Sequence, residues 1–476
     1  MADSAIALMA HLLRRAGFGA PRSELETRVS RGYEETVEEL LHPEDQEPLD
    51  IYEFLRYLPW QWHAGNQDVG QASWVWRMIS TRAPLQEKMT AFYHGLFATG
   101  VAKVDHYHEI VDMVDMFRDR ALGKYGDILV DVARNPAMIY WLDNNQNHAD
   151  SVNENWGREL LELFTMGVGS YTEQDVMECS RAFTGWTITP KIPRYPMGRF
   201  DWTFEYKDFD HDDGEKTFLG HTGRFNGEDV IEIILQQPAT AYFIARHLYN
   251  FFVADEAQVS AWSVTRPRDP EAVDLLAGAL MDSGYDMRSV LRLLFNSDFF
   301  KASRFAKVKS PFEAVVGAVR LVGDDQFPKY VGYSDVSTSI PDIMEWSNQI
   351  AYMGQDLLNP PSVEGWHTGT EWINSGSLMK RTNFFAEMFS DLGRPGTRYI
   401  VGRLKSEGSS PETFVDTCLD LVGPLEIDDE SRDELVAHTS SDGALEWDTQ
   451  DQSEASAQRV AEMLQLIVSL REYQLA

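Results

Sequence analysis

The sequence has almost no cysteine and little lysine, and these shortages exclude several classes of protein. Two cysteines in 476 residues are too few for a disulfide framework or a cysteine metal cage, so we interpret both as buried thiols. Only 12 of the 42 basic residues are Lys, whereas Asp and Glu number 75, giving a formal net charge of -33. Such a surface repels phosphate backbones and anionic lipid heads, so we expect no nucleic-acid partner.

Long apolar runs are also missing. No stretch reaches the length of about 18 apolar residues that a membrane helix needs, so we expect no membrane span. Arg14-Arg15 imitates a twin-arginine export signal, but small and acidic residues follow where an apolar stretch is required. As written, the sequence therefore predicts a first helix that ends near Gly17 and a cytoplasmic protein.

What the sequence does contain is ample material for a helical core. Its residues are 43% hydrophobic and 12% aromatic, and 476 residues favour two or three packed subdomains. Apolar residues recur at helical spacing through most of the chain, and Thr172 with Asp175 has the pattern of a helix cap. The prediction is a mainly α, multi-helix protein. Helices are predicted over 34–42, 84–99, 107–121, 126–134, 154–166, 228–236, 238–253, 270–283, 287–295, 311–322 and 341–352.

One segment carries a β pattern instead. Phe200, Trp202, Phe204 and Tyr206 alternate with polar residues, and HDDGEKTFLG then supplies a turn and a return segment, which predicts one small β-hairpin. Four regions follow from these patterns. They are a helical region at 1–190, a hairpin insertion at 191–227, a second helical region with a Trp-rich loop at 228–392, and a C-terminal helical segment at 393–476 whose acidic stretch 426–456 we expect to be partly mobile.

The stretch NENWGRELLELFTMG (153–167) gathers polar side chains on one narrow stripe of a mostly apolar helix. In one interpretation, Arg158 pairs with Glu154 and Glu162 at four-residue spacing and the stripe is a ladder of ordinary ion pairs. In the other, Glu159 and Glu162 leave the helix together as metal ligands or as an acid/base pair, with Arg158 and Asn155 beside them. The sequence leaves both interpretations open.

A second polar cluster is the loop HDDGEK. His211, Asp212 and Lys216 surround one glycine there, and they could bind a cation or position an anionic group. A plain hairpin turn with surface charges would have the same composition.

Two further candidates contain histidine. In PPSVEGWHTGTEWI, Trp366 and His367 are typical of a loop that faces a sugar or a peptide, although aromatic anchors of an irregular segment would look alike. His94 lies on the same side of its predicted helix as Glu87, either as a core histidine or as a metal ligand. No nucleophile elbow, P-loop, zinc-protease or dinucleotide motif occurs.

Several blocks together resemble the bacterial domain-of-unknown-function family 1800. They run in order from about residue 11 to residue 385. The blocks are HLLRRAGFGAPRSELE, LQEKMTAFYHGLFAT, ARNPAMIYWLDNNQN, NENWGRELLELFTMGVGSYTEQDVMECSRAFTGWT, HDDGEKTFLG, PATAYFIARHLYNFFV, KVKSPFEAVVGAVR and MGQDLLNPPSVEGWHTGTEWI.

The resemblance implies a mostly helical protein of unestablished activity, often exported and often encoded beside a sulfatase-like companion protein. Family members typically have His-Asn-His-Phe where this chain has His94-Gly-Leu-Phe97, and Glu-Leu-His-Thr where it has Glu162-Leu-Phe-Thr165. If those histidines are metal ligands in the family, carboxylates must replace them here. Carboxylates favour Mg²⁺, Mn²⁺ or Ca²⁺ over Zn²⁺.

The resulting hypothesis is a carboxylate-based enzyme, with or without a divalent cation, that acts on a carbohydrate or a modified peptide. We expect the 153–166 helix, the 211–216 loop and the 362–372 loop to converge on one cavity, since polar stripes on buried helices need a common destination. Metal ligands would come from Glu159, Glu162, His211, Asp212 and His94. The alternative is a non-catalytic structural or assembly protein that works with a companion.

Overall fold

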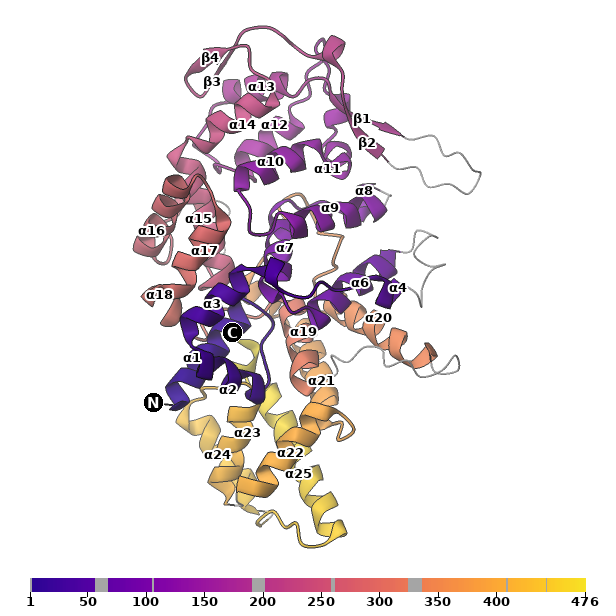
Figure 1. Cartoon of the computed structure of the whole chain (residues 1–476), viewed down its shortest axis with the longest axis vertical. Helices are drawn as coiled ribbons and strands as arrows, with labels where there is room; N and C mark the ends of the chain where they lie inside the picture. Colours follow the sequence, from indigo (N-terminus) through magenta and orange to yellow (C-terminus); the bar gives the residue numbers. More distant parts are fainter. Residues whose placement is uncertain are drawn as a thin grey trace.

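The computed structural model describes residues 2–55, 67–104, 107–190, 202–257, 262–323, 336–407, 410–441 and 443–476. Helices dominate these residues, and the only strands among them form two small sheets, which confirms the predicted mainly α class. The molecule is elongated, with α10–α14 and the strands at one end and α22–α25 at the other (Figure 1).

The first half of the chain supplies the middle of the molecule and one of its ends. The predicted cap is present, since Thr172 and Asp175 form a capping box, and the side chain of Asn135 caps a further helix that starts at Pro136. The helices are α1 (Ala2–Arg15), α2 (Arg22–Arg31), α3 (Tyr33–Leu41), α4 (Tyr52–Leu55), α6 (Gln67–Ser80), α7 (Pro84–Leu96), α8 (Val101–Val104), α9 (Tyr107–Asp119), α10 (Tyr125–Arg134), α11 (Pro136–Trp141), α12 (Asn155–Glu162) and α13 (Glu173–Ala182).

The second half returns through the middle and then forms the opposite end. Helix α17 packs against α3, and α20 packs against α6, so segments far apart in sequence share one core. The helices are α14 (Gly227–Leu235), α15 (Pro238–Phe252), α16 (Pro270–Ser283), α17 (Met287–Asn296), α18 (Asp298–Lys301), α19 (Pro311–Val322), α20 (Val336–Tyr352), α21 (Ser375–Ser390), α22 (Pro395–Glu407), α23 (Pro411–Leu421), α24 (Asp429–Ser441) and α25 (Gln450–Ser469).

The β insertion is present, but its strands pair differently from the prediction. Strand β1 (Trp186–Pro190) pairs antiparallel with β2 (Trp202–Tyr206), while β3 (Lys216–Phe218) pairs with β4 (His221–Gly223). The expected pairing of the aromatic strand with the segment after HDDGEK is therefore wrong. The physical reason is that residues 208–216 are tied to the end of α13 and cannot turn the chain back onto β2. Residues 191–201 of the predicted insertion lie outside the described residues.

The acidic stretch 426–456 is largely helical in its described residues, and the expectation that part of it is mobile stays a prediction. Asp429 and Glu430 lie in the first turn of α24, where carboxylates stabilise the positive end of the helix dipole. Leu435 is buried and holds this helix to its neighbours. Thr449 and Gln452 form a capping box at the start of α25. Local capping and one apolar anchor thus outweigh the polar composition.

Helix α7 is the centre of the packing, because nearly all of its residues are buried, the charged ones included. Its apolar side contributes Tyr93 and Phe97 to a continuous set of ring contacts with Phe117, Tyr125 and Phe164. The hydroxyl of Tyr125 donates to the carbonyl oxygen of Phe164 at 2.6 Å, so this cluster also joins α10 to the end of α12. Buried aromatic contacts of this kind dominate the energetics of a core.

No helix among the described residues is long and apolar enough to cross a membrane.

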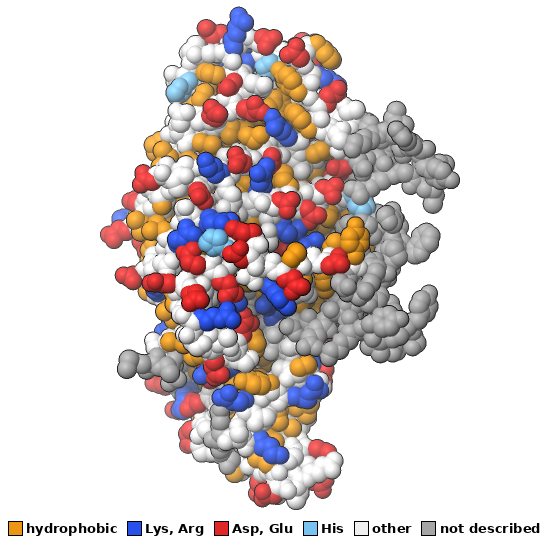
Figure 2. Space-filling model, in the orientation of Figure 1, with side chains coloured by type: hydrophobic (Ala, Val, Ile, Leu, Met, Phe, Trp, Pro, Cys, Tyr) orange, Lys and Arg blue, Asp and Glu red, His pale blue; other side chains and the backbone are white. Residues whose placement is uncertain are grey.

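The surface carries side chains of both charges, as the composition predicts. On the face shown in Figure 2, acidic and basic side chains are interspersed over the whole length of the molecule rather than separated into two patches. The charge is therefore spread out, which limits local repulsion.

Helices α12 and α13 approach each other unusually closely at Gly157. A Cβ atom built on Gly157 would overlap the hydroxyl of Ser180 and would lie 3.1 Å from the carbonyl oxygen of Val176. Only glycine leaves the backbones room to meet at this spacing. The contact fixes the position of the polar stripe of α12 relative to the rest of the protein.

We predict that Gly157→Ala destabilises the protein by about 1–3 kcal/mol, since overpacking forces the two helices apart. Gly278→Ala is the matched control. Gly278 lies in the interior of α16, and an added Cβ meets no atom within 4 Å. That substitution is expected to stabilise by about 0.5–1 kcal/mol through helix propensity. Urea denaturation measures both, and equal stability of the two variants would contradict the proposed close contact.

Candidate active site

A pocket of about 380 Å³ lies where α7, α15 and the end of α12 meet the loop at 362–372. We call it the central pocket. Its volume falls within the range of about 300–1,000 Å³ that small-molecule sites occupy. Its walls are largely aromatic, with a few carboxylates on one side. Lining residues include Phe92, Glu162, Tyr242, His247, Glu364 and Trp366.

Glycine places the Trp-rich loop in this pocket. Gly365 has a φ of 80°, and a Cβ there would overlap the carbonyl oxygen of Gly95 in α7. The loop backbone therefore rests directly on the helix, which sets Trp366 against the ring of His94 with centroids 5.3 Å apart. Trp372 lines the pocket further along, and its buried indole N–H has no hydrogen-bond partner among the described residues. Such a donor is available to a ligand.

Helix α15 forms the opposite aromatic wall. The ring of His247 lies between Phe243 and Trp262, at centroid distances of 4.3 and 4.9 Å. Burial, followed by the charge of Arg246, lowers the pKa of His247 to about 3. This histidine is therefore neutral at physiological pH and serves as a flat surface rather than as a charge.

Two carboxylates line the acidic side of the pocket, and a third, Glu159, lies near them without lining it. Glu162 and Glu364 line it, and the hydroxyl of Tyr171 donates to Glu162 at 2.9 Å. Glu159 lies one helical turn before Glu162, and its pKa is raised to about 7, chiefly by burial and then by the negative charges of Glu162 and Glu364. Arg158 opposes this shift only in part. A carboxyl group that is half protonated at neutral pH can exchange a proton with a ligand.

Arg158 makes one of the two ion pairs that the sequence spacing predicts. It pairs with Glu154 at 3.1 Å, as expected, but its second partner is Glu173 of α13, at 2.7 Å, and not Glu162. Glu162 is occupied by Tyr171 instead. Arg158 therefore ties α12 to α13 on the outer side of the stripe. It is not among the residues that line the central pocket.

The helix is also shorter than predicted. It ends at Glu162 rather than at 166, because the backbone N–H groups of Met166 and Gly167 both donate to the carbonyl oxygen of Leu161. Gly167 has a φ of 74°, the left-handed conformation that terminates helices. Asn155, a predicted substrate-binding residue, is exposed and its amide approaches Asp143 at 3.5 Å, so it does not line the pocket.

His94 follows the core-histidine interpretation. It is 2% exposed, and its Nε2 accepts a hydrogen bond from the backbone N–H of Leu358 at 3.2 Å. Burial lowers the pKa of His94 to about 3. An Nε2 lone pair that already accepts a hydrogen bond is not free for a metal ion, so His94 supports Trp366 instead of ligating.

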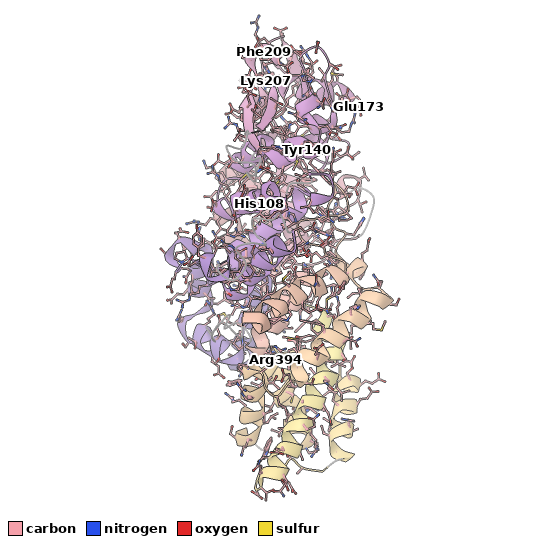
Figure 3. The ribbon with its side chains drawn as sticks, turned by 90° about the vertical axis from the view of Figure 1, so that its right-hand side faces the viewer. His108, Tyr140, Glu173, Lys207, Phe209 and Arg394 are labelled. Carbon is pink, nitrogen blue, oxygen red and sulfur yellow. The ribbon has the colours of Figure 1, made fainter. Side chains whose placement is uncertain are left out.

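The loop with His211, Asp212 and Lys216 does not join the pocket. Asp212 pairs with Arg181 at 2.7 Å, near the C-terminal end of α13, whereas Glu173 at the other end of that helix meets Arg158. Eight residues of helix separate these contacts, or about 12 Å along the axis. Figure 3 places Glu173 on one side of this end of the molecule and Lys207 and Phe209, which precede the loop, on the other.

The polar side chains of this loop already have hydrogen-bond partners within the protein. Nδ1–H of His211 donates to the carbonyl oxygen of Thr184 at 2.9 Å, and the buried ammonium of Lys216 donates to the carbonyl oxygens of Asp212 and Gly214. These hydrogen bonds hold the loop against the end of α13. The expected convergence of three polar segments thus holds for two of them, the end of α12 and the 362–372 loop.

These placements bear on the predicted metal site. Within the ranges that the structure describes, no group of three or more His, Cys, Asp or Glu side chains could hold a metal ion. Of the five predicted ligands, Glu159 and Glu162 lie together, His94 is in the core, and His211 and Asp212 lie in the loop that packs against the end of α13. The divalent cation that the sequence suggested therefore stays a prediction.

Sequence reasoning placed Trp366 and His367 at the site and missed most of the remaining wall. Both residues line the central pocket, and His367 is exposed near Glu371 at 3.5 Å. Tyr242, His247 and Asn250 of α15 were not proposed. A signal was present in PATAYFIARHLYNFFV, because its aromatic residues occupy more than one side of a helix, so they cannot all face one core.

We predict that Glu159→Gln leaves the protein as stable as wild type near pH 4.5 and more stable at pH 8. The folded state raises the pKa of Glu159, so as the pH rises the unfolded chain loses this proton first, and stability falls between about pH 4.5 and pH 7. Glutamine removes that cost, which we put at about 1 kcal/mol because solvent screens a partly exposed group. Urea denaturation across pH measures it.

Glu232→Gln on the exposed face of α14 is the control, and its stability difference from wild type should not depend on pH. A Glu159→Gln variant that is less stable than wild type at both pH values would show instead that the carboxylate is a structural partner.

Comparisons with known proteins were made for the whole chain. Neither the curated proteins nor the solved structures contain a match. A family model matches residues 11–475, a range that includes every helix lining the central pocket. The expected resemblance is confirmed over nearly the full length, and the chain belongs to the family described as "Protein of unknown function (DUF1800)".

Proposed function

We propose that the central pocket binds a carbohydrate or a sugar-modified peptide and that Glu159 and Glu162 act there as an acid/base pair. The observation that carries this proposal is the raised pKa of Glu159 beside two carboxylates that line an aromatic pocket. Groups with strongly shifted pKa values in a cleft are typical of catalytic sites.

The aromatic walls suit a ligand with flat apolar faces and polar edges. Trp366 and Tyr242 line the pocket from opposite elements, so a sugar ring could stack on either of them. The unpartnered N–H of Trp372 offers a donor to a hydroxyl or carbonyl group of the ligand. A purely apolar ligand would leave that donor and the carboxylates unsatisfied.

The carboxylates can divide the two halves of a hydrolysis between them. Glu159, about half protonated at pH 7, donates its proton to the leaving oxygen, while an ionised neighbour takes a proton from the attacking water. Glu162 fits the second role because it lines the pocket and the hydroxyl of Tyr171 holds its carboxylate in place. The scheme does not itself require Mg²⁺, Mn²⁺ or Ca²⁺.

A second candidate is an assembly role together with a sulfatase-like companion protein. The ion pairs of Arg158 favour this assembly role. Arg158 bridges Glu154 and Glu173, so part of the polar stripe of α12 is structural. In that case the pocket would hold a side chain of the companion, and no substrate would be turned over. Co-purification of the native protein with a companion, in the absence of any hydrolysis, would favour this candidate.

We predict that Trp366→Ala weakens binding of oligosaccharides or glycopeptides by about 3–10-fold, the effect of losing one stacking surface. A panel of both ligand classes, screened by calorimetry against the full chain, provides the measurement. Tyr352→Ala is the matched control, because Tyr352 is 58% exposed and does not line the pocket. Equal loss of binding in both variants would contradict the assignment of the pocket.

Glu159→Gln should bind the same ligand yet hydrolyse it about 100–10,000-fold more slowly, as expected when a general acid is removed. Treatment with a chelator should leave the wild-type rate unchanged. Full activity of the glutamine variant would exclude Glu159 as the acid. Loss of activity on chelation would instead bring back the divalent cation that the sequence suggested.

A further inference from the structure

A second concentration of charge, which is positive, lies around the start of α19, next to the central pocket that Lys307 also lines. Arg15, Lys88 and Arg381 are each at most 1% exposed, and Lys307 is 4% exposed. In a chain whose net charge is -33, the interior would be expected to hold few unbalanced cations. Taking a charge out of water is costly unless an opposite charge accompanies it.

The described carboxylates near this cluster are too few to balance it. Glu313 pairs with both Lys88 and Lys307, the latter at 3.3 Å. Asp255 accepts from the backbone N–H of Val308 at 2.8 Å, and it influences Lys307 and Arg15. Two carboxylates thus already serve three cations.

Arg381 makes no ion pair among the described residues, although the charge of Glu313 attracts it. Its three guanidinium nitrogens are buried and have no hydrogen-bond partner among the described residues. Nε and Nη1 of Arg15 are likewise without a partner there. Lys309 lies close enough to Arg381 and Arg14 for their charges, together with burial, to lower its pKa to about 7. The region therefore carries positive charge in excess, and its members repel one another.

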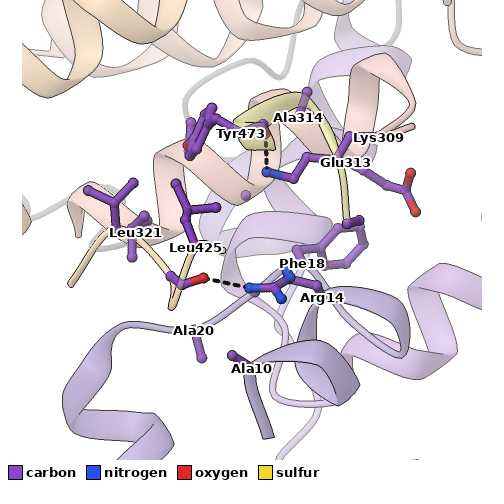
Figure 4. A pocket seen from close by; sticks show the side chains of 16 residues that line it. Ala10, Arg14, Phe18, Ala20, Lys309, Glu313, Ala314, Leu321, Leu425 and Tyr473 are labelled. Carbon is purple, nitrogen blue, oxygen red and sulfur yellow. Dashed lines mark hydrogen bonds between the residues drawn. The ribbon is translucent and has the colours of Figure 1, made fainter. Parts of the chain in front are cut away.

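A small pocket opens onto this region. It has a volume of about 50 Å³ and is lined by Arg14, Lys309, Glu313, Phe18 and Tyr473, together with small residues and Ala476 (Figure 4). Arg14 donates to the carbonyl oxygen of Gly423 at 2.6 Å, and Lys309 donates to that of Tyr473 at 2.6 Å. Each cation keeps further N–H groups for another acceptor.

Figure 4 shows that the carboxylate of Glu313 points away from both the Arg14 guanidinium and the Lys309 ammonium. The carboxylate of Glu313 therefore makes its ion pairs with Lys88 and Lys307, and it attracts Lys309 from a greater distance. The space is sufficient for an ion, since a buried water needs about 10–15 Å³ on the same scale and the pocket holds several times that.

We propose that this pocket binds one small inorganic anion, either chloride or a tetrahedral oxyanion such as phosphate or sulfate, between Arg14 and Lys309. The anion neutralises part of the buried cation cluster and accepts the remaining N–H groups of both side chains. The site shares no proposed catalytic group with the central pocket, so it stands whether or not the carboxylates there are catalytic.

The test is thermal unfolding of the full chain in gluconate buffer, with chloride, phosphate or sulfate added at constant ionic strength. At least one of the three should raise the wild-type Tm in a saturable manner, by about 3 °C when its concentration is about one hundred times its Kd. The anion that acts at the lowest concentration identifies the occupant. General salt effects do not saturate in this range and affect all variants alike.

Lys309→Met removes one of the two proposed ligands and also one of the mutually repelling cations. Its Tm without added anion should equal or exceed that of wild type, and the saturable rise should disappear. Arg14→Gln should lose the rise as well. Lys380→Met is the matched control and should keep the full rise, because Lys380 is exposed and lies outside the pocket.

An anion that remains bound through purification would hide the rise, so the wild type is also unfolded after dialysis against gluconate and the released ions are measured by ion chromatography. About one anion per chain is then expected, and much less in Lys309→Met. The proposal is overturned if wild type shows neither a saturable rise nor a released anion, or if Lys309→Met responds as wild type does.

Discussion

Glu313 is the residue on which the centre of the molecule depends. Its carboxylate neutralises Lys88 of α7 and Lys307, and it also accepts from the backbone N–H and the hydroxyl of Ser310, both at 2.8 Å, as the cap of α19. These contacts hold its pKa well below the ordinary value despite burial. A buried carboxylate that loses its partners, or lysines that lose theirs, would leave uncompensated charge in the core. Both pockets lie against residues that this group holds in place.

The polar stripe of α12 illustrates how one surface can serve two purposes. On its outer side, Arg158 joins Glu154 to Glu173 and locks two helices that Gly157 brings close together. On its inner side, Glu162 lines the central pocket and Glu159 lies near it. The ladder interpretation of NENWGRELLELFTMG therefore holds for Arg158 and Glu154, while a neighbouring helix supplies Glu173 in place of Glu162. The site interpretation stays a proposal.

Helix positions were accessible from the sequence because their causes are local. Apolar spacing, the proline at 136 and the capping pair Thr172 and Asp175 each act within one or two turns. Strand pairing was not accessible, since the ends of β1 and β2 are set by how residues near 211 are anchored on α13. The same holds for the site: Trp366 reaches it only because Gly365 rests on the carbonyl oxygen of Gly95, a contact across most of the chain.

Both pockets place like charges close together, and the consequence is the same in each. At the central pocket, burial and then the charges of Glu162 and Glu364 make it costly for Glu159 to ionise, so its pKa rises to about 7. At the small pocket, burial and then the charges of Arg14 and Arg381 make it costly for Lys309 to keep its proton, so its pKa falls to about 7. A group poised near neutrality changes its charge for little free energy. At the first pocket the proton is then available for transfer. At the second, an arriving anion restores the positive charge of Lys309, so binding and protonation favour each other.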